Sequence, residues 1–291
     1  MSHIQRVTTT GRASLTVWRL LQALTLGCLL MAQSLFAADN SVSLGVVPQF
    51  EQRKLFATWK PIVDELSQRT GLEVKLLVTL SIQEFEQELE KGSFDFVYAN
   101  PYHILKVSNS QGYIPLVRDR EPLRGILVVR KDSPVRKVSE LAGKTLAIPS
   151  PNALGASLLM QADLQHVFGT QMTLLNVRTH SSVYLHVLNG LTDAGGGVEK
   201  TLAEQDASVR DNLRVLYTTR AMPSHPVAAH PRVPRAFREK LQKALLDMGN
   251  TPGGKALLED IPMPVPEKTS LDDYLPMRQW GLDAYWQNPK K

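Results

Sequence analysis

The segment from Ile148 to Ser157 could bind an anion, because an apolar strand there passes through a short polar loop into a helix. The first N–H groups of a helix lack partners within it, and the helix dipole adds partial positive charge at that end. Such a turn favours an anion. Ser150 or Asn152 is expected to cap the helix, and Ser157 to lie one turn inside it. Ordinary capping without any ligand would produce the same pattern.

A second cluster of polar side chains runs from Asp95 to His103, after another expected strand. It contains Tyr98, Asn100 and Tyr102 at the carboxyl end of that strand, where ligands gather in open α/β sheets. Tyrosine hydroxyls and asparagine amides can donate hydrogen bonds to an oxyanion without a change of protonation. The alternative interpretation is that a helix begins after Asn100 and that the tyrosines are half-buried packing residues.

The third candidate is His180, which also lies between an expected strand and an expected helix. As an imidazolium it could pair with an anionic ligand, and it would titrate near its reference pKa of about 6.5. Glu199 could neutralise His180 or cap a helix. The glycines before it, Gly195–Gly197, would let the backbone approach a ligand closely.

The sequence contains no motif for catalysis or metal binding. It lacks the Gly-x-Ser-x-Gly, His-Glu-x-x-His and Gly-x-x-x-x-Gly-Lys patterns. His180 and His186 should face different sides of one helix, and His225 and His230, each followed by proline, fit a rigid crossing strand better than a metal site. We therefore expect a protein that is not an enzyme, with no metal or cofactor. Nucleic acid is disfavoured as a partner, because basic residues do not form a stripe interleaved with aromatic ones.

Strands and helices alternate from residue 41 onward, which predicts an α/β fold with mixed, mostly parallel sheets flanked by helices. Two successive cycles of strands and helices predict two lobes with a cleft between them. The last stretch is expected to be mostly helical, including residues 272–286, and it could extend the first lobe. The expected strands are 42–47, 73–78, 94–98, 125–130, 145–148, 172–177, 192–194 and 213–217, and the main helices are 51–69, 82–91, 153–166, 182–189, 198–205 and 235–248.

The first 37 of the 291 residues are typical of a cleavable export signal. Residues 1–19 carry three arginines and no acidic residue, and an apolar stretch too short to span a membrane comfortably follows, then small residues at Ala37 and Ala38. Cleavage after Ala37 would lower the formal net charge from +5 to +2 and remove Cys28, the single cysteine of the chain. We therefore expect a nearly neutral, thiol-free periplasmic protein.

In their order along the chain, several segments resemble the phosphate/phosphite/phosphonate-binding proteins of bacterial ABC importers. The resemblance covers essentially the whole chain after the export signal. The segments that carry it are Gly45–Pro48, Phe94–His103, Val129–Pro134, Leu141–Lys144, Pro149–Ser157, His180, Asn189–Gly190, Asp193–Ala194 and Pro223–Pro234.

This resemblance implies a two-lobed type II periplasmic binding protein that binds its ligand in a cleft between the lobes. Lobe one would comprise residues 38–126 plus 228–291, and lobe two residues 127–227. The lobes would close on the ligand by a hinge motion. The anion would lie on the helix start at Asn152, Ala153, Leu154 and Gly155, with Tyr98 and His180 contributing from other sides. The implied protein is a monomer that delivers its ligand to an ABC permease in the inner membrane.

The sequence departs from this family at two places. Ala153 and Leu154 stand where phosphonate binders usually have hydroxyl residues, and no acidic side chain is evident in Gly195–Gly197 to meet a ligand amine. The ligand is therefore left open among phosphate, phosphite, a phosphonate or another small anion. One alternative is a periplasmic sensor that signals to a membrane sensor kinase. Another is an enzyme related to thiamine-precursor synthesis. It would need a reactive cofactor or a cluster of histidines in the cleft, whereas the histidines are scattered in the sequence and export argues against cytosolic metabolism.

Overall fold

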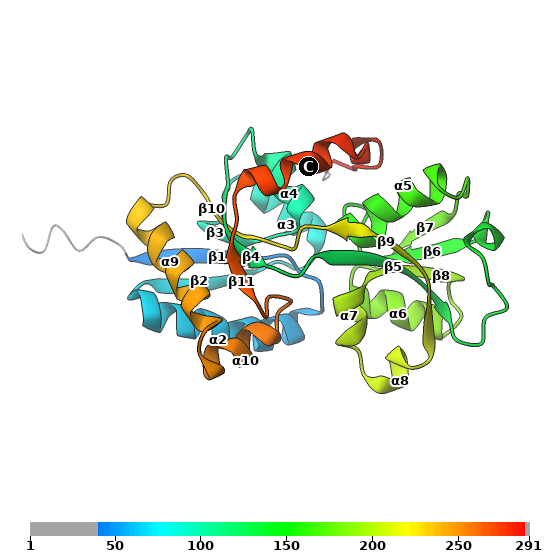
Figure 1. Cartoon of the computed structure of the whole chain (residues 1–291), viewed down its shortest axis with the longest axis horizontal. Helices are drawn as coiled ribbons and strands as arrows, with labels where there is room; N and C mark the ends of the chain where they lie inside the picture. Colours follow the sequence, from blue (N-terminus) through cyan, green and yellow to red (C-terminus); the bar gives the residue numbers. More distant parts are fainter. Residues whose placement is uncertain (1–39, 289–291) are drawn as a thin grey trace, which may run out of the picture. The chain divides into compact units, whose positions relative to one another are not determined.

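The computed structural model describes residues 40–288, and the segment expected to be an export signal lies outside them. The chain after Asn40 forms one compact unit. It contains two mixed β-sheets, each flanked by helices (Figure 1). Within the described residues, no helix is long and apolar enough to cross a membrane.

The first sheet is parallel on one side and antiparallel on the other. Its strand order is β11-β4-β10-β3-β1-β2, in which β1 pairs in parallel with β2 and β3, while β10, β4 and β11 are joined by antiparallel pairing. The strands are β1 (Ser41–Val46), β2 (Glu73–Val78), β3 (Phe96–Tyr98), β4 (Ile114–Asp119), β10 (Val227–Ala229) and β11 (Pro266–Lys268).

Helices cover both faces of this first sheet (Figure 1). On one face lie α2 (Gln52–Thr70), α9 (Arg235–Met248) and α10 (Pro252–Glu259), and on the other α3 (Ile82–Glu90) and α4 (Pro101–Val107). The buried face of α2 follows helical spacing, and the helix ends where Gly71 adopts a φ of 69°, a conformation that glycine takes without a steric penalty. The buried residues of that face are Leu55, Trp59, Ile62, Val63, Leu66 and Thr70.

The second sheet has the order β7-β6-β8-β5-β9, again with a parallel and an antiparallel side. Its strands are β5 (Leu123–Arg130), β6 (Thr145–Ile148), β7 (Thr173–Asn176), β8 (Ala194–Val198) and β9 (Leu213–Met222). Its helices are η1 (Val138–Leu141), η2 (Leu154–Leu158), which continues into α5 (Leu159–His166), then α6 (His180–Leu188), α7 (Glu199–Ala203) and α8 (Ala207–Arg210). The expectation of mixed sheets flanked by helices is confirmed. The sheets are not mostly parallel, because the strands next to the two crossings, β4, β5, β9 and β10, all pair in the antiparallel sense.

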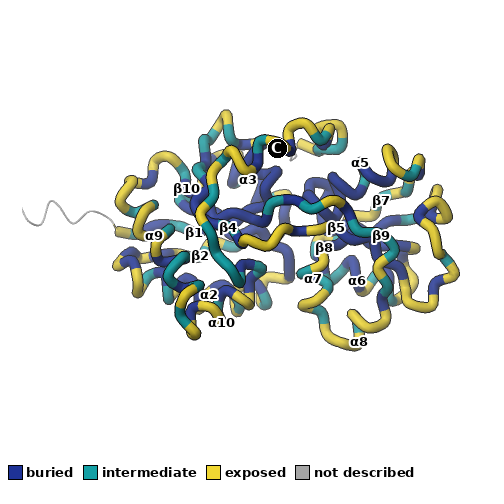
Figure 2. The backbone as a smooth tube through the Cα atoms, viewed as in Figure 1, coloured by how far each residue is buried: buried dark blue, intermediate teal, exposed yellow. Residues whose placement is uncertain are grey.

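Strand β5 shows how the second sheet is packed on both faces. Leu127 and Val129 belong to the apolar cluster that includes Met160 of α5, whereas Ile126 and Val128 pack in the cluster of α6. Successive side chains of a strand point to opposite faces, so one apolar run can serve both helix layers. Figure 2 shows the result, with buried backbone in the sheets and exposed backbone along the outer helices.

Two crossings join the sheets, from β4 to β5 and from β9 to β10. The C-terminal segment, residues 271–288, contacts both halves as well. It forms three short 3-10 turns, η3 (Leu271–Asp273), η4 (Leu275–Gln279) and η5 (Leu282–Ala284), in place of the longer helix expected from the sequence. Its apolar side chains form one cluster with those of α4 in the first half and of η2 and α5 in the second. The segment therefore packs on both halves and not on the first lobe alone.

Candidate functional site

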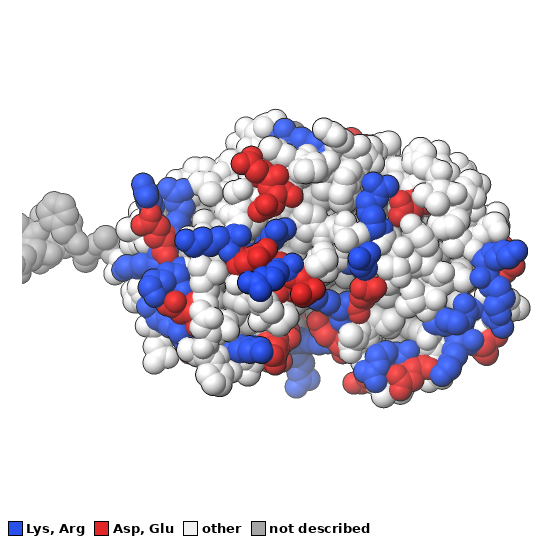
Figure 3. Space-filling view, viewed as in Figure 1, with Lys and Arg blue, Asp and Glu red and all other residues white. Residues whose placement is uncertain are grey.

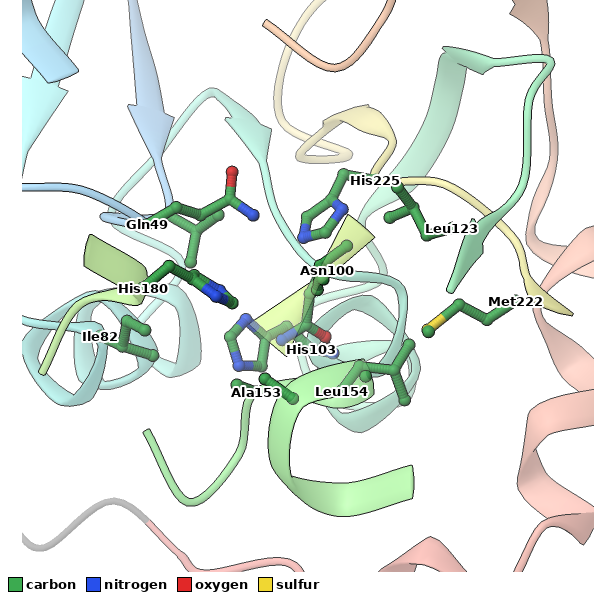
Figure 4. A pocket seen from close by; sticks show the side chains of 14 residues that line it. Gln49, Ile82, Asn100, His103, Leu123, Ala153, Leu154, His180, Met222 and His225 are labelled. Atoms are coloured by element: carbon green, nitrogen blue, oxygen red, sulfur yellow. Dashed lines mark hydrogen bonds between the residues drawn. The ribbon is translucent and has the colours of Figure 1, made fainter. Parts of the chain in front are cut away.

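A small cavity lies between the two sheets, with about 30 Å³ open to the centre of a water molecule and about 440 Å³ of unoccupied space when its opening to solvent is counted. It is lined on one side by residues that follow β1 and β3, and on the other by the start of η2 (Figure 4). The polar lining residues are Gln49, Asn100, His103, His180 and His225. The others are Val47, Ile82, Leu123, Ala153, Leu154, Gly155, Ala156, Val198 and Met222.

Asn100 and His103 are placed by the turn that follows β3. Asn100 is the N-cap of α4, where its Oδ1 accepts a hydrogen bond from the backbone N–H of His103 at 2.9 Å, and Pro101 occupies the first helical position. This capping fixes the Asn100 side chain, whose Nδ2 donates to the backbone oxygen of Asn152 across the cavity wall at 3.3 Å.

The start of η2 presents backbone donors to the cavity. The first bonds of this π-helical turn have Ser157 and Leu158 as donors, both to the carbonyl of Ala153, at 2.8 and 3.1 Å. The N–H groups of Leu154, Gly155 and Ala156 precede these bonds, so the helix itself does not use them, and all three residues line the cavity. The dipole of the helix that continues through α5 adds partial positive charge at this point.

Glycines in the second sheet allow this helix start to lie directly on the strands. A Cβ at Gly196 would collide with the carbonyl of Ala156, and one at Gly125 with the carbonyl of Gly155. Gly195 and Gly197 instead face Val183 and Tyr184 of α6. The expectation that Gly195–Gly197 bring the backbone close to a ligand is therefore wrong, because these glycines make room for helices.

Three histidines from distant segments line the same cavity. His103 Nε2 lies 2.9 Å from Oε1 of Glu86, and His180 Nδ1 lies 3.3 Å from the Thr201 hydroxyl. His225 stacks on the ring of Tyr98, with ring centroids 5.4 Å apart. Within the part of the chain that the structure describes, the Nδ1 atoms of His103 and His225 are buried without a hydrogen-bond partner. Buried polar atoms are nearly always paired, so these two point to a bound molecule or water.

Burial keeps two of these histidines uncharged. It lowers the pKa of His180 to about 4. The pKa of His225 falls to about 3, mainly through burial and to a lesser extent through electrostatic repulsion from the neighbouring basic groups, among them Lys200. The imidazolium expected at His180 is therefore wrong for the ligand-free protein at neutral pH, because a charge at this buried position would lose its hydration.

Neutral donors dominate the cavity. Among its lining residues, all of which the structure describes, there is no Lys, Arg, Asp or Glu, and no hydroxyl or thiol side chain. Lys200 instead forms an ion pair with the buried carboxylate of Asp119. The arrangement suits hydrogen bonding to a small anion, with N–H groups of the backbone and of the side-chain amides as donors and with neutral imidazoles that can each donate from one ring nitrogen and accept at the other. It offers no side-chain nucleophile other than imidazole.

Five of the eleven candidate residues line this cavity, namely Asn100, Ala153, Leu154, Gly155 and His180. Tyr98 lies against His225, buried and with its hydroxyl unpartnered within residues 40–288, and burial raises its pKa well above the usual value. The hydroxyl of Tyr102 donates to Asp283 of the C-terminal segment at 2.9 Å. Glu199 is exposed at the start of α7.

The three remaining candidates have structural partners of their own. Asn152 donates through Nδ2 to Glu86 at 3.0 Å and to the backbone oxygen of Gln287 at 2.7 Å. Ser150 accepts from the Asn152 backbone N–H at 3.3 Å, and Ser157 from Gln161 at 3.0 Å. The expectation that Ser150 or Asn152 caps the helix is wrong, because Ala153 is the N-cap and makes no side-chain cap bond.

Sequence reasoning missed several lining residues. Gln49 could have been found, since it follows β1 at the carboxyl end of a parallel strand, where ligands gather. His225 lies in the segment between β9 and β10 and was interpreted only as part of a crossing. No local pattern marks Leu123 or Met222. The argument that scattered histidines form no cluster is also wrong, because folding gathers three of them here.

The three imidazoles do not form a metal site. Within residues 40–288, no group of three or more His, Cys, Asp or Glu side chains is placed to hold a metal ion.

The surface charges are mixed, with Lys and Arg interspersed among Asp and Glu on the face shown in Figure 3.

Two mixed α/β halves, joined by two crossings and enclosing a cavity, define a two-lobed solute-binding protein. Comparison with known sequences supplies the family. Residues 44–274 match the model of the phosphonate ABC transporter periplasmic substrate-binding proteins, and the chain belongs to this family. It is 21% identical over 268 residues to the phosphonates-binding periplasmic protein of Escherichia coli K12, covering 87% of this chain and 79% of that protein.

Solved structures show the same fold. A binding protein component of an ABC phosphonate transporter from Pseudomonas aeruginosa has a TM-score of 0.77 at 17% identity, covering 85% of this chain and 89% of that one. PhnD1 from Prochlorococcus marinus, in complex with methylphosphonate, has a TM-score of 0.76 at 15% identity, covering 84% of this chain and 98% of that one.

Proposed function

We propose that this protein captures a small phosphorus oxyanion, of the phosphonate, phosphite or phosphate type, in the cavity between its lobes. One observation carries the proposal. Three residues at the start of η2, whose backbone N–H groups the helix does not use, line the same cavity as His103 and His225, whose Nδ1 atoms have no hydrogen-bond partner. A monoprotonated oxyanion between them could accept from the backbone N–H groups of one half and donate its P–OH hydrogen to an imidazole nitrogen of the other.

Contacts across the cavity support a mechanism in which the lobes close on the ligand. Asn100 Nδ2 bonds to the Asn152 backbone oxygen at 3.3 Å, the His180 N–H bonds to the Gln49 backbone oxygen at 3.1 Å, and Lys200 pairs with Asp119. Each contact joins an element of the first sheet to one of the second. A ligand that bonds to both halves stabilises this arrangement over an open one, which is the hinge closure described for periplasmic binding proteins.

We place the limits of the lobes in the two crossings. The limit expected at residues 126/127 falls inside β5, whose residues from Leu123 onward pair with β9. Boundaries at residues 120–122 and 223–226 keep every strand whole within one sheet. Lobe one then comprises residues 40–119 and 227–268, lobe two residues 123–222, and the C-terminal segment packs on both.

The proposed partner is an ABC permease in the inner membrane, which would accept the ligand from the closed protein. The family description names an ABC transporter component, which favours import over signalling to a sensor kinase and over catalysis. We propose that the N-terminal 37 residues export the chain to the periplasm, where it acts as a monomer.

Isothermal titration calorimetry tests the proposal directly. The full-length gene is expressed, the protein is recovered from the periplasm, and its N-terminus is determined by mass spectrometry. Methylphosphonate, phosphite and inorganic phosphate are then titrated at pH 7. Binding of at least one of them with a dissociation constant of about 1 µM, or about −8 kcal/mol, is expected. No heat and no thermal shift with any of the three would contradict the proposed function.

A further inference from the structure

The cavity has a polar side and an apolar side. In Figure 4, Gln49, His180 and Ile82 lie on one side, while Leu123, Leu154 and Met222 lie on the other, with His225 next to Leu123 and with His103 and Asn100 between the two sides. A ligand that uses the polar donors must therefore direct part of its surface toward three apolar side chains.

The apolar side is a built part of the fold. Leu123 at the start of β5 pairs with Met222 at the end of β9, so the antiparallel register of these strands sets the two side chains next to each other. Leu154, the first residue of η2, belongs to the same apolar cluster, and all three are at most 4% exposed. A group placed against them loses its contact with water.

No charge is available to a ligand amine on this side. The lining includes no Asp or Glu among the described residues, and Glu86, whose carboxylate lies behind His103, is already bonded to that histidine and to Asn152. An ammonium held against Leu123, Leu154 and Met222 would be desolvated without a counter-ion, which is strongly unfavourable. A phosphate hydroxyl directed at these three side chains would lose its hydrogen bonds to water and gain none from them, which is unfavourable to a smaller degree.

We propose that this cavity selects phosphonates with a short apolar substituent, methyl or ethyl, over inorganic phosphate and over aminoalkyl phosphonates, and that Leu123, Leu154 and Met222 determine this selectivity. The inference rests on the proposed function and names its substrate class. The phosphonate oxygens bond to the start of η2 and to the polar side, and the alkyl group packs on the three apolar side chains.

The direct test compares methylphosphonate, ethylphosphonate, 2-aminoethylphosphonate and inorganic phosphate by calorimetry at pH 7. Methyl- or ethylphosphonate is expected to bind at least about tenfold more tightly than phosphate, the discrimination that one misplaced group typically produces in a protein pocket. 2-Aminoethylphosphonate is expected to bind more weakly than phosphate. Equal or tighter binding of phosphate or of the amine overturns the inference and leaves the proposed function standing. Absence of binding by all four overturns both.

A charge placed on the apolar side should reverse the preference. Met222→Glu supplies a carboxylate for the ligand amine, so 2-aminoethylphosphonate should become at least about tenfold tighter than methylphosphonate. Met222→Gln is the matched control, with nearly the same shape and no charge, and it should not gain affinity for the amine. An unchanged order of ligands in a folded Met222→Glu protein contradicts the assignment of this side.

A second variant covers the case in which Met222→Glu does not fold. Leu123→Ala enlarges the apolar side without adding a polar group. Propylphosphonate should then gain affinity relative to methylphosphonate, so that the ratio of their dissociation constants changes by about tenfold in favour of propylphosphonate. A ratio equal to that of the wild-type protein contradicts the inference. Circular dichroism and thermal unfolding establish that each variant is folded.

Discussion

His103 and Glu86 form a buried pair at the edge of the ligand cavity, with Nε2 of the histidine 2.9 Å from Oε1 of the glutamate. Both side chains are at most 3% exposed. The carboxylate accepts from the histidine Nε2–H, which leaves the other ring nitrogen, Nδ1, as an unpartnered acceptor in a residue that lines the cavity. The second carboxylate oxygen accepts from Asn152 of the other lobe at 3.0 Å. One buried carboxylate thus orients a ligand-facing ring and links the lobes.

Glu86→Gln should destabilise the protein by about 1–3 kcal/mol, because one amide oxygen must then serve two buried donors, His103 Nε2–H and Asn152 Nδ2–H. Urea denaturation measures the change. Glu259→Gln is the control, since Glu259 forms an exposed ion pair with Lys255 on α10 and should change stability by less than about 0.5 kcal/mol. Equal stability of the Glu86→Gln and wild-type proteins would show that the buried pair has no structural role.

His180→Ala should weaken phosphonate binding and reduce the number of protons taken up on binding. The ligand-free histidine is neutral at pH 7 because burial lowers its pKa to about 4, and a bound anion must raise that pKa. Affinity should therefore increase as the pH falls from 7 toward 5. Calorimetry in buffers of different ionisation enthalpy counts the protons.

The control for this prediction is His186→Ala on the same helix, whose ring bonds to the Ser182 carbonyl instead of lining the cavity. It should bind ligand as the wild-type protein does. Proton uptake that is the same in the His180→Ala and wild-type proteins would assign the titrating group to another residue or to the ligand.

The ligand-free protein should lose stability as the pH falls below about 6.5. In the unfolded chain His180 and His225 titrate near 6.5, whereas burial holds their folded pKa values near 4 and 3. The unfolded state therefore binds more protons between these values, and stability decreases by up to about 1.4 kcal/mol per histidine for each pH unit. Urea midpoints at pH 7.5, 6 and 5 measure this slope.

His225→Gln should make that pH dependence shallower, whereas His166→Gln, at an exposed position beside Tyr285, should leave it unchanged. Identical slopes for the His225→Gln and wild-type proteins would contradict the assignment of acid sensitivity to the cavity histidines.

Gly196→Ala should destabilise the protein by about 1–3 kcal/mol and weaken ligand binding, because the new methyl group collides with the Ala156 carbonyl at the start of η2. Unfolding curves and calorimetry measure the two effects. At Gly253, in the first turn of α10, a methyl group meets open space, so Gly253→Ala should be neutral or stabilising by up to about 1 kcal/mol. Wild-type behaviour of Gly196→Ala would show that the helix start is not held by this contact.

Asn152→Ala should release the end of the C-terminal segment, because the asparagine makes two hydrogen bonds with the backbone of Gln287, at 2.7 and 2.9 Å. Faster hydrogen exchange is expected in residues 275–288. Tyr285→Phe removes an exposed hydroxyl contact of the same segment with Gln165 and should have little effect. Unchanged exchange in Asn152→Ala would mean that the other contacts of the segment, such as the Tyr102–Asp283 hydrogen bond and the apolar packing of Trp286, are enough to hold it.

Local patterns were sufficient to predict the alternating strands and helices, the mixed sheets and the start of a helix after β6. Hydrophobic periodicity and helix-start chemistry depend on neighbours within a few residues, so they can be read directly. The same reasoning located Asn100, the helix start at Ala153–Gly155, and His180, all of which line the cavity.

The tertiary structure alone decided which polar residues face the cavity and what charge they carry. Asn152, Tyr102 and Ser157 look like ligand donors in the sequence, yet each bonds to a distant or helical partner. His103, His180 and His225 meet only because both lobes contribute to one wall, and their neutrality follows from the loss of water there. Long-range strand register and desolvation depend on the whole fold, which is why Leu123 and Met222 had no signal of their own.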